Sequence, residues 1–135
     1  MKQLLTMLIA ISFFSCKNEE KKETAYPETS NSSVSEGATA NLSPSAKTGQ
    51  EIFDGKGNCF TCHKSGEKAI GPSIEQIANA YKGKPGSMVK FLKEEADPIV
   101  DPEQYEVMKT NLYLTKTFSD TELKSLEDFF LSFNK

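Results

Sequence analysis

Apolar residues recur at helical spacing in several segments of the chain, and no alternating strand pattern of any length accompanies them. The pattern predicts a helix over residues 45–54, with Ser45 as its N-cap. A second helix is expected directly after Ser73, and a third begins at Ser87 and ends before Asp97. These periodicities predict an all-α domain.

The strongest helical pattern lies near the C-terminus. Phe118 and Leu123 form a hydrophobic staple around a capping box that runs from Ser119 to Glu122. The apolar stripe of this helix consists of Leu123, Leu126, Phe129, Phe130 and Phe133. We expect the helix to be buried along that stripe and to pack across the predicted helix at 45–54.

Residues 99–113 lack a comparable stripe. The pair Asp101-Pro102 predicts one or two short helical turns, because proline is favoured at the start of a helix. The remainder of the segment, which contains Met108, is predicted to be irregular.

The N-terminus has the pattern of an export signal. Lys2 supplies the positive start, and residues 4–14 form an apolar run that is too short for a membrane span. Ser15 and then Cys16 follow, and the run Phe13-Phe14-Ser15-Cys16 resembles the lipobox of bacterial lipoproteins. Residues 1–15 are therefore predicted to be a lipoprotein signal peptide and Cys16 the lipidated residue, with ordinary cleavage and a free thiol as the alternative. Several acyl chains on one cysteine give a stable anchor.

Residues 16–43 are rich in Lys, Glu, Ser and Thr and poor in apolar residues. Such a composition cannot bury a core, so this segment is predicted to be a flexible linker with a reach of about 30 Å. Lysine rather than aspartate follows Cys16. The resemblance to bacterial lipoproteins then implies the outer membrane as the site of the anchor. The domain then spans residues 44–135.

Composition narrows the classes of function. The chain has 135 residues and a net charge of -3, and nothing in this balance indicates binding to nucleic acid. No pair of carboxylates stands out as catalytic among the charged segments, which are more typical of solvated faces.

The chemistry concentrates in the run Cys59-Phe60-Thr61-Cys62-His63. Two cysteines at this spacing can each form a thioether to one porphyrin, and the histidine after the second can bind the iron. His63 is the only histidine of the chain. The run therefore predicts one covalently attached haem c, which would also add buried apolar surface to a small domain.

Two other kinds of site share this cysteine spacing. A structural zinc normally takes four Cys or His ligands, and only Cys59, Cys62 and His63 remain once Cys16 is assigned to the anchor. A thiol redox pair is expected near a β-α-β unit, and no such pattern precedes the motif. Both alternatives fit less well than haem.

A haem held by His63 has a second axial position that a methionine, a lysine or water can fill. Met88 lies on the apolar face of the third predicted helix, where methionine more often fills a core. We therefore expect Met108 to be the ligand, with a vacant site or a lysine as alternatives. The carbonyl of Pro72 can accept the Nδ1–H of His63 and so fix its tautomer.

From residue 49 onward the chain resembles a class I c-type cytochrome of the small bacterial type. The resemblance rests on Gly49 with Phe53, the haem motif, Gly71-Pro72, Met108, and Leu126 with Phe129. It implies the cytochrome c fold, with four to five short helices around one haem. It also implies that Gly49 lets the first and last helices cross closely, that the Pro72 carbonyl accepts from His63, and that Met108 binds the iron.

These expectations combine into one function. With both axial positions filled by protein, we expect a one-electron carrier, not an enzyme, that works with redox protein partners in a respiratory or other periplasmic chain. The lipid anchor would hold it on the periplasmic side of a bacterial membrane. The alternatives are an open-site haem protein, such as a peroxidase-like protein or a gas sensor, and a fixed cytochrome subunit of an oxidase or dehydrogenase complex.

Overall fold

The computed structural model describes residues 41–134, so the predicted signal peptide, Cys16 and most of the predicted linker lie outside the described residues. The described part contains five α-helices and two short 3-10 helices and has no strand. No helix within residues 41–134 is long and apolar enough to span a membrane. The predicted all-α class is confirmed. The elements in chain order are α1 (Pro44–Asp54), η1 (Cys59–Thr61), α2 (Ile74–Tyr81), α3 (Ser87–Leu92), η2 (Pro102–Gln104), α4 (Tyr105–Thr115) and α5 (Asp120–Leu131).

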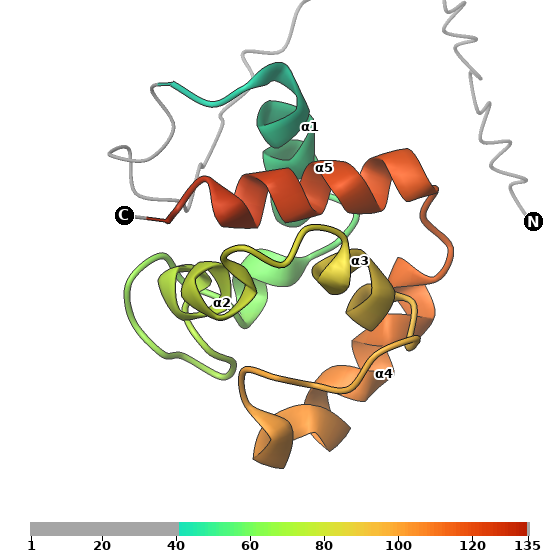
Figure 1. The fold of residues 1–135 in the computed structure, drawn as a ribbon. Coiled ribbons are helices and arrows are strands. Elements are labelled where there is room, and N and C mark those ends of the chain that lie inside the picture. The colour runs from blue at the N-terminus through green and yellow to red at the C-terminus, as the bar shows by residue number, and fades with distance from the viewer. Residues whose placement is uncertain (1–40, 135) are drawn as a thin grey trace, which may run out of the picture. The chain divides into compact units, whose positions relative to one another are not determined.

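Helix α5 is the centre of the fold. It packs against α1 on one side and against α2 and α3 on the other, and α4 lies beyond α3 (Figure 1). Its capping box is formed as predicted, because the side chains of Ser119 and Glu122 each bond the other residue's backbone N–H. The predicted apolar stripe is buried along its whole length.

The crossing of α1 and α5 depends on one residue without a side chain. A Cβ built on Gly49 would lie 1.9 Å from the carbonyl oxygen of Ser125, so only glycine allows this approach. Directly beside the crossing, the ring of Phe53 lies 5.1 Å from that of Phe129 and 5.5 Å from that of Phe130. The predicted crossing of the first and last helices is confirmed.

The N-cap of helix α1 lies two residues earlier than expected. Ser43, not Ser45, is the N-cap, and its hydroxyl accepts the N–H of Ala46 at 3.2 Å. Pro44 occupies the first helical position, where its missing N–H has no cost. The hydroxyl of Ser45 is thereby free to donate to Asp128 of α5 at 2.7 Å.

The third helix begins where it was predicted and ends earlier. Helix α3 stops at Leu92, and Glu94 follows with a φ of 58°, in the left-handed region that ends a right-handed helix. The sequence pattern predicted that the helix continues until just before Asp97. The observed helix ends at Leu92.

The prediction of an irregular segment around Met108 is wrong. After the short helical turn at Pro102, which was expected, the chain continues into the eleven-residue helix α4. Only Leu112 and Thr115 of this helix are buried, so its sequence has no continuous apolar stripe. Thr115 anchors the helix, because its hydroxyl donates to the Leu92 carbonyl of α3 at 2.6 Å.

Candidate functional site

The haem-motif residues lie in a compact turn after α1. Gly57 has room for no side chain, since a Cβ there would lie 2.7 Å from the Ile52 carbonyl oxygen. Asn58 then adopts a left-handed conformation with a φ of 49° and leads into η1. The N–H groups of Cys62 and His63 both bond the Cys59 carbonyl, at 3.1 and 3.0 Å. The second cysteine and the histidine are thus presented together at the end of the turn.

His63 is held in one orientation. Its Nδ1 lies 2.8 Å from the carbonyl oxygen of Pro72, the pairing expected from the sequence. A carbonyl only accepts, so Nδ1 carries the proton and Nε2 keeps a lone pair for a metal. Gly71 lies against the ring, because a Cβ there would be 2.6 Å from Cε1 of His63. The ring also meets Phe130 edge to face, with centroids 6.3 Å apart.

The protonation state of His63 suits a metal ligand. The side chain is 9 % exposed, and this burial lowers its pKa, while the hydrogen bond to the Pro72 carbonyl opposes the shift. Burial thus favours the neutral imidazole, which is the form that binds a metal.

A cavity of about 770 Å³, open solvent at its mouth included, begins at this histidine. Cys62, His63, Pro72 and Met108 all line it, so the structure brings four of the predicted site residues together. Its mainly apolar lining is typical of a pocket for a cofactor. The polar or charged side chains elsewhere in the lining are those of Tyr81, Asp101, Gln104, Tyr105 and Asn111.

The two cysteines of the motif differ in their surroundings. Cys62 lines the cavity, whereas the Sγ of Cys59 lies 3.5 Å from the Gly57 carbonyl oxygen and is not part of the lining. Burial raises the pKa of the Cys59 thiol to about 12. The sequence spacing gave no reason to distinguish the two thiols.

Both candidate methionines line the cavity. Met88 comes from α3, is 2 % exposed and belongs to the hydrophobic core. Met108 comes from α4 and is only partly buried against that core. Their positions in the cavity lining do not distinguish the two methionines as candidate ligands. The depth to which each is buried does.

The cavity also has features that sequence reasoning missed. Tyr105 and Asn111 line it from α4, and the pattern could not indicate them because that helix was itself missed. Lys68 pairs with Asp101 of the lining at 2.8 Å, which joins the loop after the motif to the segment before η2. No sequence signal marks that ion pair, because its partners are 33 residues apart.

The side chains present fit a covalently attached haem. The cavity offers an imidazole with its Nε2 lone pair available, a thiol on the wall, two thioethers and an apolar surface. Within residues 41–134 no three His, Cys, Asp or Glu side chains are grouped so that they could hold a metal ion by themselves. A zinc site therefore receives no support from the described residues.

Comparison with protein families gives one match relevant to this site. The family model described as Cytochrome c matches residues 46–134, a range that includes the motif, the cavity and all of helices α2 to α5. No curated protein matches the chain.

Proposed function

Because this chain belongs to the cytochrome c family, whose members bind haem c covalently and carry electrons, we propose that it is a monohaem one-electron carrier with His63 and Met108 as axial ligands. One observation carries the proposal. His63, fixed through its Nδ1 by the Pro72 carbonyl, lines the same apolar cavity as Met108. With His63 and Met108 both bound to the iron, substrate would not reach it.

Each motif residue has a distinct role in this proposal. Cys59 and Cys62 would attach the haem through thioethers, and His63 would bind the iron through Nε2. When bound, the haem supplies a one-electron couple between Fe(II) and Fe(III). Pro72 holds the imidazole, and the apolar lining disfavours the additional charge of the oxidised form, which raises the reduction potential.

Packing supports Met108 over Met88 as the sixth ligand. Moving a methionine out of a core leaves a cavity, and a buried methionine is worth about 2–5 kcal/mol to the fold. Met88 is 2 % exposed and would incur that cost, whereas Met108 is partly exposed on a helix with only two buried residues. The side chain of Met108 can therefore turn toward an iron at lower cost.

The spectrum of the purified holoprotein tests this function. A reduced-minus-oxidised spectrum with a redox titration should show one low-spin haem c with methionine ligation and a raised potential. A high-spin haem that binds CO rapidly in the reduced state, without a change of fold, would instead indicate an open site. Recovery only as part of a larger complex in mild detergent would indicate a fixed subunit.

The cellular location of the protein is proposed from its sequence. Residues 1–15 act as a signal peptide, Cys16 carries the lipid, and the polar segment 16–43 tethers the domain to the periplasmic face of a membrane, the outer membrane being favoured. The tether would let the domain meet a respiratory donor and acceptor in turn. Mass spectrometry of the mature N-terminus should find a diacylated Cys16, and Cys16→Ser should release the protein from membranes. A mature N-terminus without lipid would refute the anchor.

A further inference from the structure

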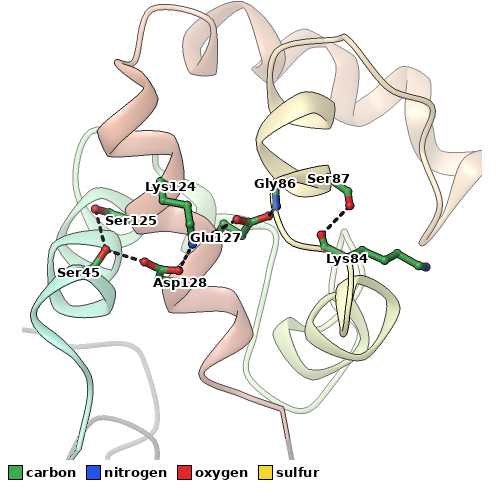
Figure 2. Close-up of polar contacts among 8 residues, drawn as sticks. All are labelled: Ser45, Lys84, Gly86, Ser87, Lys124, Ser125, Glu127 and Asp128. Atoms are coloured by element: carbon green, nitrogen blue, oxygen red, sulfur yellow. Dashed lines mark hydrogen bonds and ion pairs between the residues drawn. The ribbon is translucent and has the colours of Figure 1, made fainter.

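A buried carboxylate lies on α5, outside the proposed ligand set. Glu127 is 0 % exposed, and its Oε1 accepts the backbone N–H of Gly86 at 2.8 Å (Figure 2). Its Oε2 has no hydrogen bond to any described residue, and the nearest cation is the Lys124 Nζ at 3.4 Å. Burying an ionised carboxylate with so few partners is unfavourable. Stability alone therefore does not account for a carboxylate at this position.

The charged and titratable groups around Glu127 come from two helices. Lys124, one turn earlier on α5, pairs mainly with Asp128, which also accepts from Ser45 of α1 (Figure 2). From α2, Tyr81 is close enough for the Glu127 charge to raise its pKa, after burial, to about 12. Tyr81 lines the cavity, so the Glu127 carboxylate acts on a residue of the cavity wall.

The bond to Gly86 is made at the start of α3. Gly86 is the N-cap of that helix, has a φ of 77°, and provides no side-chain cap. A Cβ at Gly86 would meet nothing within 4 Å, so the backbone conformation and not space requires glycine. Helix α3 has only six residues, and a helix this short depends on contacts with the rest of the protein. The carboxylate of Glu127 is such a contact.

Helix α3 is also a wall of the haem cavity. Met88, Phe91 and Leu92 line the cavity from this helix. At its far end the Leu92 carbonyl accepts from Thr115 of α4, and the ring of Phe91 lies 6.2 Å from that of Tyr105. A shift of α3 would therefore change both the cavity wall and the support of the helix that carries Met108.

We propose that Glu127 is a positioning residue that fixes α3, and through α3 the wall of the haem cavity, by accepting the hydrogen bond from Gly86. The role rests on the proposed function, because it concerns the surroundings of the haem and of Met108. It requires an acceptor oxygen at one place and does not require the negative charge.

Three substitutions separate the acceptor from the charge. Glu127→Gln keeps an acceptor oxygen at the same reach and removes the charge, whereas Glu127→Asp keeps the charge and withdraws the oxygen by one methylene. Glu127→Ala removes both. Ser45→Ala is the matched control, because it breaks a hydrogen bond to α5 on the side facing α1 and leaves α3 untouched.

The holoproteins are compared by reduction potential and by affinity of the oxidised haem for imidazole, at a temperature where circular dichroism shows each to be folded. We expect Glu127→Asp and Glu127→Ala to lower the potential and to bind imidazole several-fold more tightly, because a displaced α3 admits water and ligand. Glu127→Gln and Ser45→Ala should match the wild type in both. If Glu127→Ala does not fold, the Asp and Gln variants decide the matter alone.

Three outcomes would overturn the role. Unchanged values in Glu127→Asp would show that α3 does not depend on the acceptor. If Glu127→Asp and Glu127→Gln changed the potential and the imidazole affinity equally, packing would be the cause. If Ser45→Ala changed them as much as Glu127→Asp, a general loss of stability would be the cause. The wild-type spectrum reports on the His63 and Met108 ligation independently, so failure of the carrier proposal is distinguishable from failure of the Glu127 proposal.

Discussion

Replacing Met108 with alanine should remove the sixth ligand of the iron. We expect the holoprotein variant to lose the weak absorption band in the red that a bond between methionine sulfur and iron produces, and to have a lower reduction potential, because water or a stronger donor then replaces the thioether. Since Met108 is only partly buried on a helix with two buried residues, the loss of packing should be modest.

Met88→Ala is the matched control, because it truncates the same residue type in the same cavity. Met88 is 2 % exposed, so its truncation should lower the free energy of unfolding by about 2–5 kcal/mol. In a domain of this size that change lowers the melting temperature by roughly 10 °C or more. The red band should remain.

Absorption spectra, redox titration and thermal unfolding of both holoproteins make the comparison. Loss of the band in Met88→Ala together with its retention in Met108→Ala would refute the assignment. Retention of the band in both variants would refute methionine ligation by either residue. The reasoning from burial depth would then be wrong as well, since it selects Met108.

Three further predictions test the frame of the site. Gly49→Ala should destabilise the holoprotein by about 3 kcal/mol, because its Cβ would lie 1.9 Å from the Ser125 carbonyl oxygen; an unchanged denaturant midpoint would contradict the close crossing. Gly71→Ala should disturb the low-spin spectrum, because its Cβ would lie 2.6 Å from Cε1 of His63; an unaltered spectrum would show that the imidazole has room to move. The pKa of Glu122 falls from 4.5 to about 2, chiefly because of its bond to Lys56 and its bonds to the N-cap Ser119. This carboxylate therefore stabilises the folded state above pH 4.5, and that contribution is lost as the pH falls toward 2. Glu122→Gln should make the free energy of unfolding vary less with pH between 4.5 and 2. An unchanged pH dependence would contradict the ion pair of Glu122 with Lys56.

Many features of the helices could be predicted because the sequence patterns that indicate them are local. The capping box at Ser119, the staple of Phe118 and Leu123, and the stripe of α5 lie within sixteen consecutive residues. The structure forms the capping box and buries both staple residues and the stripe. The close crossing at Gly49 was implied by the family resemblance, and the structure has it. The N-cap of α1 was misassigned because Ser43 and Ser45 are both good caps, and the proline between them decides in favour of the first.

Features that join distant segments were not predictable. The stripe of α5 was identified by its apolar residues, so Glu127, which lies on the buried side of the same helix, was not included. Its partner is a backbone N–H 41 residues away, and no sequence pattern encodes that meeting. The same holds for the unequal surroundings of Cys59 and Cys62, which follow from how the turn folds back on Gly57.

The failure at α4 has a different cause. A helix is recognised by an apolar stripe that faces the rest of the chain, and α4 buries only Leu112 and Thr115 in this way. Tyr105, Val107, Met108 and Asn111 face the cavity instead. The family binds its haem covalently, and in the proposed holoprotein these residues would meet that cofactor, which is absent from the sequence. The helical pattern of α4 therefore looks incomplete when the chain is considered alone, and the segment that local rules describe least well is the one that carries the proposed ligand.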